Sequence, residues 1–159
     1  MGGEPARRTT SGRTLRLVTN EPIPGVRQDD PLEESALSLP GHRRSVAAGR
    51  HWVVRESAER GVTGMANQIV ELLTSELLAN AVLHGPPGGN VGLRLQCSET
   101  VVRVTVSDRE TAMPVVLHPD PIAPSGRGMA IVEAMSNRWG VEAVGGGKSV
   151  WFELDLDEY

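Results

Sequence analysis

Three side chains capable of chemistry recur at intervals of four residues in the segment ELLTSELLANAVLHG, residues 71–85. They are Glu76, Asn80 and His84, and positions four apart share one face of an α-helix, which turns about 100° per residue. The residues around them are mostly apolar, so these polar groups need partners if they are buried. A carboxylate one turn from an amide supplies hard oxygen ligands, which suit a magnesium ion and a water positioned for attack. The pattern indicates a nucleotide site, although a polar stripe facing solvent explains this segment alone equally well.

Two further segments carry residues that suit the two ends of a nucleotide. Asp108 follows the apolar run VVRVTV, and an aspartate at a strand end can accept hydrogen bonds, for example from an exocyclic amine. An ordinary turn aspartate is the simpler alternative at that position. Gly126, Arg127 and Gly128 stand directly before an apolar helical pattern, where free backbone amides and the helix dipole favour phosphate. The arginine adds a charge that can bind two phosphate oxygens at once.

The segment GGGKSVWFEL, residues 145–154, looks at first like a phosphate loop. A Walker loop has the spacing GxxxxGK[ST] and continues into a helix, whereas here Lys148-Ser149 leads into the strand-like run VWFEL. We therefore interpret Gly145–Gly147 as a hairpin turn. Ser149 is then expected to point inward from its strand, near Asp108 if the two strands are neighbours.

The elements that must position these residues follow from hydrophobic periodicity and from the breakers between segments. Helices are expected over about 43–60, 66–83 and 128–137. Strands are expected over 91–97, 101–108, 139–144 and 148–156, with shorter candidates at 14–18 and 35–40. The proline-rich segment 109–127 predicts a long loop. Paired strands with short turns and three helices predict an α/β two-layer sandwich, in which the helices cover one face of a mixed, mostly antiparallel sheet.

Length and composition limit the class of protein. The 159 residues favour one domain at 38–159, preceded by a flexible tail at 1–37 that is rich in Pro, Gly, Thr, Arg and Asp. The net charge of −4 differs from that of a strongly basic nucleic-acid binder. The single cysteine, Cys97, allows no disulfide within the chain and is expected to be a small buried side chain. Without a signal peptide or an apolar run of about 18 residues, the expected location is the cytoplasm.

Four segments, taken together and in this order, resemble the motifs of one superfamily. They are SELLANAVLHG (75–85), VSD (106–108), GRGMAIVEAMSNRWGV (126–141) and GGGKSVWFEL (145–154). The superfamily contains gyrase, heat-shock chaperone, histidine-kinase and mismatch-repair ATPases, which share the Bergerat fold. Within it the chain is most similar to bacterial anti-sigma-factor serine kinases and their stand-alone ATP-binding relatives. The likeness extends over about residues 38–154.

This resemblance implies ATP and Mg²⁺ as cofactors and assigns roles to the residues that match the family's motifs. Asn80 looks like the magnesium ligand, and Glu76 looks like the general base that activates a water or a serine hydroxyl. Asp108 is similar to the aspartate that reads adenine, with the Ser149 hydroxyl beside it.

The remaining site residues follow from the second glycine box of the family. Gly126, Arg127 and Gly128 fall on this box, which wraps the phosphates as part of a lid. His84 falls on a position that is often histidine in the family. One departure concerns the first glycine box, which usually reads Asp-x-Gly, because here Asp108 is followed by Arg-Glu-Thr-Ala at 109–112.

The resemblance implies a cytoplasmic anti-sigma-factor serine/threonine protein kinase that phosphorylates an antagonist protein and sequesters a sigma factor. The missing glycine favours an alternative, a catalytically weak or inactive nucleotide-binding module that regulates transcription by protein contact alone. A histidine-kinase catalytic fragment is disfavoured because no dimerising helical hairpin precedes the domain. The arginine-rich outer face of the first helix would suit an acidic partner, and a solvated face explains it equally well. Homodimerisation is common in the family and is expected here.

Overall fold

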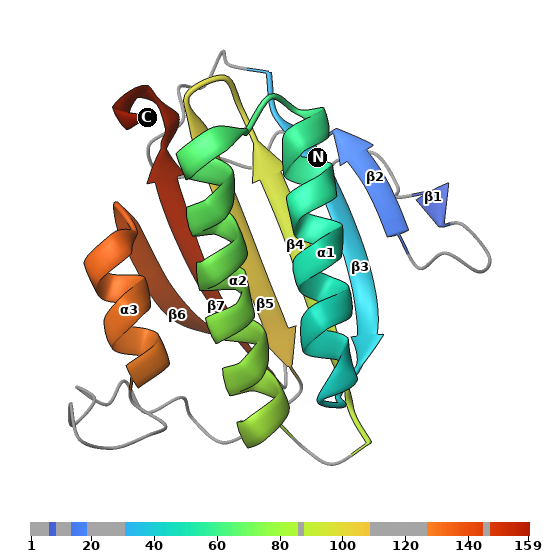
Figure 1. Ribbon diagram of the computed structural model, residues 1–159. Coiled ribbons are helices and arrows are strands. Elements are labelled where there is room, and N and C mark those ends of the chain that lie inside the picture. Colours follow the sequence, from blue (N-terminus) through green and yellow to red (C-terminus); the bar gives the residue numbers. More distant parts are fainter. Residues whose placement is uncertain (1–6, 9–13, 19–30, 86–87, 109–126, 145–146) are drawn as a thin grey trace.

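A seven-stranded antiparallel sheet forms one layer of the protein, and three α-helices lie side by side over one of its faces (Figure 1). The computed structural model describes residues 7–8, 14–18, 31–85, 88–108, 127–144 and 147–159. The strands follow the spatial order β1-β2-β3-β4-β5-β7-β6, and every described pair is antiparallel. The expected α/β two-layer sandwich is therefore confirmed, with an antiparallel sheet throughout the described strands.

The elements lie close to the expected ranges. The strands are β1 Arg7–Arg8, β2 Thr14–Val18, β3 Glu33–Pro40, β4 Asn90–Cys97, β5 Val101–Asp108, β6 Arg138–Val144 and β7 Gly147–Asp155. The helices are α1 Arg44–Glu59, α2 Gly64–His84 and α3 Arg127–Met135, and a short 3₁₀ helix spans Leu156–Glu158. The strand suggested at 14–18 is confirmed as β2. The strand suggested at 35–40 is confirmed as β3, which begins two residues earlier, at Glu33.

Two helix boundaries show local physical causes. Helix α1 ends just before Gly61, whose φ of 87° is a left-handed conformation that glycine adopts without strain. The Val62 amide returns to the Ser57 carbonyl at 2.9 Å, which satisfies one of the last carbonyls of the helix. Helix α2 starts at Gly64, two residues before the expected Ala66, and ends at His84 before the Gly-Pro-Pro breaker. None of the helices in the described ranges combines the length and apolar character needed to cross a membrane.

Alternation along the strands separates a helix-covered face from an open face of the sheet. On β5, Val102, Val104 and Val106 are buried under the helices, where they meet Phe152 and Leu154 of β7. The intervening residues of β5 face the other side. The core is completed by the apolar stripe of α2, which consists of Ala66, Ile69, Val70, Leu73, Leu77, Leu78 and Ala81. This burial holds α2 against the sheet and sets which of its side chains remain at the margin.

The open face carries a network of paired charges near the carboxyl end of β7. Glu153 is fully buried, and its Oε1 accepts a hydrogen bond from Arg138 Nε at 2.6 Å. Arg103 Nη1 lies 3.4 Å from the other oxygen of Glu153, and its guanidinium stacks over the Trp151 ring at 4.0 Å. Burial raises the pKa of Glu153, while the hydrogen bond from Arg138 and the charge of Arg103 lower it. The buried carboxylate therefore depends on its two arginines.

We predict that Arg138→Ala lowers the free energy of unfolding by about 3 kcal/mol, because it leaves the Glu153 charge buried without its nearest partner. Urea denaturation followed by circular dichroism measures the change. Arg55→Ala is the control, since Arg55 is exposed on α1 and its loss should cost less than about 0.5 kcal/mol. Equal losses in the two variants would contradict the dependence of Glu153 on Arg138.

A second prediction concerns Cys97, which is buried at the end of β4 as expected. Burial raises the pKa of the thiol to about 12, although the Arg60 charge opposes this shift. The thiolate is the reactive form, so the native protein should not react with Ellman's reagent at pH 8, and one thiol should appear in denaturant. Native protein that reacts as fast as a free thiol would contradict this.

Candidate functional site

Helix α2 holds the acid and the amide of the proposed site at the margin of its buried stripe. Glu76 and Asn80 are half-buried, between the buried Leu77 and Ala81 and the exposed face of the helix. His84 is the last residue of α2 and is exposed, where a basic side chain interacts favourably with the helix dipole. The simple interpretation of a fully solvated polar stripe therefore fits His84 but does not fit Glu76 and Asn80.

The first turn of α3 lies directly against Glu76. A Cβ atom added to Gly128 would stand 2.7 Å from Glu76 Oε2, closer than real Cβ contacts come, and 3.6 Å from Glu76 Cβ, which is an ordinary contact. Glycine at residue 128 therefore lets α3 pack on α2 without displacing the Glu76 carboxylate, which is the flexible end of its side chain. The first backbone amides of a helix have no partner within the helix, and its dipole favours an anion nearby. This junction of α2 and α3 thus combines a carboxylate with a helix start suited to an anion.

Asp108 lies beside the C-terminal end of the same helix. It is the last residue of β5, its side chain is 3% exposed, and it lies on the helix-covered face. A Cβ added to Gly85, which follows α2, would come within 3.9 Å of Asp108 Cβ. From position 76 to position 85 the helix rise amounts to about 14 Å. Helix α2 therefore links the Glu76–Gly128 contact to Asp108 across a span of that length.

The prediction that Ser149 lies beside Asp108 is wrong. The strands β5 and β7 pair Asp108 with Lys148, and Lys148 Nζ lies 4.0 Å from Asp108 Oδ2. Ser149 pairs instead with Ser107 on the open face, where the two hydroxyls are hydrogen-bonded at 2.8 Å. Successive side chains of a strand point to opposite faces, so Ser149 cannot share the side of Asp108.

The sequence contained the signal that identifies Lys148. The buried apolar residues of β7 are Val150, Phe152 and Leu154, which lie two residues apart and so share the core face. Extending this alternation backwards by two residues places Lys148 on the core face. The glycine turn drew attention to Ser149, whereas the period of the strand decides which side chain faces Asp108.

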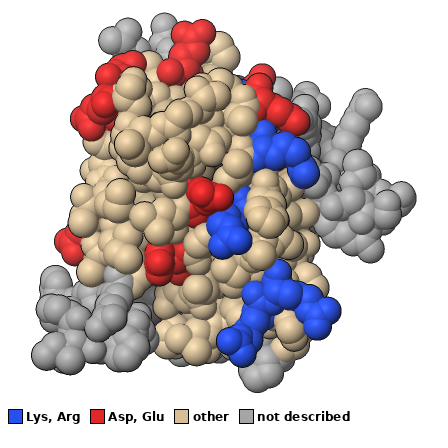
Figure 2. Space-filling view, viewed as in Figure 1, with Lys and Arg blue, Asp and Glu red and all other residues tan. Residues whose placement is uncertain are grey.

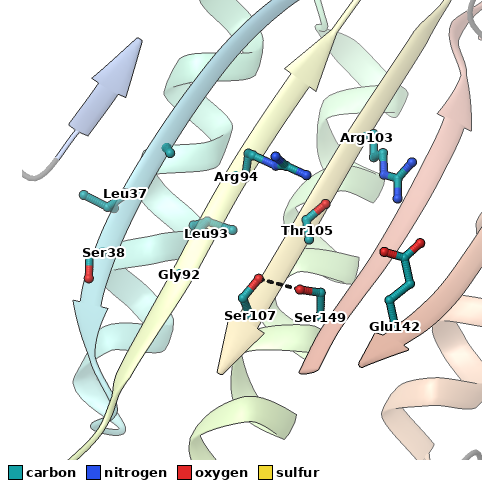
Figure 3. A pocket seen from close by; sticks show the side chains of 11 residues that line it. Leu37, Ser38, Gly92, Leu93, Arg94, Arg103, Thr105, Ser107, Glu142 and Ser149 are labelled. Carbon is teal, nitrogen blue, oxygen red and sulfur yellow. Dashed lines mark hydrogen bonds between the residues drawn. The ribbon is translucent and has the colours of Figure 1, made fainter. Parts of the chain in front are cut away.

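A hollow of about 450 Å³ lies on the open face of the sheet (Figure 3). Its floor is formed by small residues of adjacent strands, among them Gly92, Ser107 and Ser149. Arg103 and Thr105 stand beside it, and Arg103 Nε and Thr105 Oγ1 have no hydrogen-bond partner among the described residues. This hollow is separated from Asp108 and Glu76 by the thickness of the sheet, and the sequence patterns did not predict it.

The helical face has an uneven distribution of charge. Figure 2 shows its lysine and arginine side chains gathered over α1. Arg43, Arg44 and Arg55 are exposed there, and Arg50 is half-buried. The arginine-rich outer face expected for the first helix is therefore present.

Several residues of the expected site lie outside the described residues. They are the expected loop at 109–126, which includes the Arg-Glu-Thr-Ala segment at 109–112 and Gly126, and Gly145 and Gly146 of the expected hairpin turn. Arg127 is the first residue of α3, and Gly128 is the second. Among the described residues there is no cluster of three or more His, Cys, Asp and Glu side chains that could hold a metal ion.

Comparison with known proteins gives two findings. A family model described as the histidine kinase-like ATPase domain matches residues 39–154. The chain is also 25% identical over 140 residues to the sensor histidine kinase Hik2 of Thermosynechococcus vestitus. That alignment covers 79% of this chain and 36% of the relative, so the chain spans about a third of that protein's length.

Proposed function

Given that the chain belongs to the histidine kinase-like ATPase domain family, we propose that it binds ATP with Mg²⁺ between Asp108 and the α2–α3 junction. The observation that carries this proposal is the placement of two complementary groups along the C-terminal half of α2. A buried carboxylate that can read a base lies beside the last turn of the helix, and the Glu76 carboxylate lies against the first turn of α3 near the middle of α2. Their separation of about 14 Å along α2 suits an extended nucleoside triphosphate.

The residues at the α2–α3 junction fit a magnesium–phosphate group. Magnesium usually keeps several waters and takes one or two protein oxygens together with substrate phosphates, so the absence of a carboxylate cluster among the described residues agrees with this chemistry. Asn80 would supply the protein oxygen. The free amides at the start of α3, together with Arg127, would hold phosphate oxygens. The magnesium ion would neutralise charge on the phosphates when bound.

We further propose that the reaction is the transfer of the γ-phosphoryl group to a serine or threonine of an antagonist protein. Phosphoryl transfer depends mainly on positioning and charge stabilisation. Glu76 would accept the proton of the substrate hydroxyl, and the hydroxyl oxygen would form a bond to the γ-phosphorus. The bond between the γ-phosphorus and the β–γ bridging oxygen would break, which releases ADP. The half-buried position of Glu76 against α3 supports this role. The kinase named among the relatives supports a protein kinase in general, and the serine specificity rests on the resemblance of the motifs.

The proposed partners are a sigma factor, which the protein would sequester, and the antagonist that it would phosphorylate. The exposed arginines of α1 form a surface that suits an acidic segment of such a partner.

A second candidate function is regulation by binding alone. The segment after Asp108 lacks the glycine that would give the base a flat backbone surface. In addition, Lys148 lies near the Asp108 carboxylate that is proposed to bind the base. Both features favour a module that binds nucleotide weakly or whose catalysis is lost. Titration with magnesium–ATP followed by a phosphotransfer assay separates the two candidates.

For the nucleotide site, we predict that Asp108→Asn weakens magnesium–ATP binding by about tenfold or more, because it removes the charged acceptor for the base. Isothermal titration calorimetry measures the dissociation constant. Ser149→Ala is the matched control one residue beyond the pairing partner of Asp108, and because Ser149 faces the opposite side of the sheet its affinity should stay within about twofold. Unchanged affinity in Asp108→Asn, with thermal melting like that of the parent, would remove Asp108 from the site.

For catalysis, we predict that Glu76→Gln preserves ATP affinity and lowers phosphotransfer by about 100-fold or more, since the amide keeps the size of the side chain but cannot accept a proton. The measurement is transfer of labelled phosphate to the antagonist protein. Equal rates in the variant and the parent would rule out Glu76 as the base. Nucleotide binding without any transfer in the parent would favour regulation by binding alone.

A further inference from the structure

The hollow on the open face of the sheet takes no part in the proposed nucleotide site. Its volume of about 450 Å³ lies in the range of small-molecule sites, and its lining comes from β3, β4, β5, β6 and β7. The strand registers align Gly92, Ser107, Ser149 and Glu142 in one row across the sheet. Because the three central positions of this row carry no side chain larger than that of serine, the floor of the hollow is open.

Two opposite charges face each other across this floor. Figure 3 shows the guanidinium group of Arg103 and the carboxylate of Glu142 pointing toward one another. Burial lowers the pKa of Arg103, and the charges of Glu153 and Glu142 oppose this shift. Within the described part of the chain, Arg103 forms its ion pair with Glu153 and none with Glu142, which is exposed. A gap is therefore left between a cation and an anion that attract each other.

The wall on the side of Arg103 also gathers hydrogen-bond donors. Arg94 pairs with Thr105 across β4 and β5, and its partly exposed side chain extends toward Thr105 (Figure 3). Burial and, to a smaller extent, the charge of Arg94 lower the pKa of Arg103, so the two cations repel each other. Thr105 Oγ1 and Arg103 Nε are buried and have no hydrogen-bond partner among the described residues. A carboxylate would give these donors an acceptor and would reduce the repulsion between the arginines.

The charges on the two walls limit the class of ligand. A simple anion would meet the arginines but would be repelled by Glu142, and a simple cation would meet the reverse. A molecule that carries an ammonium group next to a carboxylate satisfies both walls. At the floor, the Ser107 and Ser149 hydroxyls bond to each other at 2.8 Å, which uses only one of their two hydrogens. The hydroxyl pair can therefore also bind a polar head group.

We propose that the hollow on the open face binds a free α-amino acid. The carboxylate of the amino acid lies against Arg94, Arg103 and Thr105. Its ammonium group faces Glu142 above the serine hydroxyls, and its side chain lies toward Gly92, where the floor is open. This site is separate from the proposed nucleotide site, because the sheet lies between them.

The test begins with thermal melting of the full chain in the presence of each of the standard L-amino acids. Calorimetric titration then measures the dissociation constant of the amino acid that stabilises most, which should be below about 1 mM. Its N-acetyl derivative lacks the ammonium group, and its decarboxylated amine lacks the carboxylate. Each of these should bind about tenfold or more weakly than the amino acid.

Two variants locate the binding in the hollow. Glu142→Gln should weaken the amino acid about tenfold and remove most of the preference over the N-acetyl derivative, because the amide cannot pair with the ammonium group. Thr105→Val keeps the shape of the side chain without its hydroxyl and should weaken binding about fivefold. Glu133→Gln is the matched control, since Glu133 is exposed on α3 on the other side of the sheet, and it should bind like the parent. Melting of each variant without ligand shows that it is folded.

Each contrary result overturns the proposal. The absence of any amino acid that binds below about 1 mM removes the site. Equal affinity for the N-acetyl derivative removes the role of Glu142 and with it the class of ligand. Unchanged affinity in both Glu142→Gln and Thr105→Val shows that the amino acid binds elsewhere. None of these results bears on magnesium–ATP binding, so the proposed function stands or falls separately.

Discussion

Burial of the apolar stripe of α2 against β5 and β7 is the constraint on which the rest of the arrangement depends. That stripe fixes the rotation of the helix, because turning it would expose leucines and bury polar groups without partners. With the rotation set, Glu76 and Asn80 stand at the half-buried margin of the helix, Glu76 lies against α3, and the end of the helix reaches Asp108. The polar residues are thus positioned by their apolar neighbours.

Contact between α3 and α2 adds a second local feature. The first turn of α3 lies close to the Glu76 carboxylate, and the glycine at residue 128 leaves that carboxylate undisplaced. Amides suited to an anion and the carboxylate proposed as a base therefore share one junction. The family of histidine kinase-like ATPase domains gives this junction a chemical context.

The two faces of the sheet have different stabilising interactions and are open to different uses. The helix-covered face is mostly apolar, with the Asp108–Lys148 pair on β5 and β7 and, on β3, the buried Ser35, which accepts a hydrogen bond from Arg60. The open face carries the Arg103–Glu153–Arg138 network and a hollow floored by small residues. The strands β5 and β7 contribute side chains to both faces. Because successive side chains alternate, a single substitution on either strand alters only the face to which that residue points.

Local patterns in the sequence determined the helices, the strands and the two-layer architecture. The 3.6-residue period of α2, the alternation of β5 and the glycine after α1 act over a few residues, so they can be recognised without knowledge of partners. The four segments of the site could be recognised in the same way, including the acid–amide spacing of Glu76 and Asn80.

Only the tertiary structure decided which of these groups meet. The approach of Gly128 to Glu76 joins elements far apart in the chain, and the exclusion of Ser149 from the Asp108 side follows from the pairing of β5 with β7. The sequence motifs suggested Ser149 as the neighbour of Asp108. The alternation of side chains along β7 gives that position to Lys148 instead. The physical reason is that local periodicity sets the face of a residue within its own element, whereas strand register and helix packing set what that face touches.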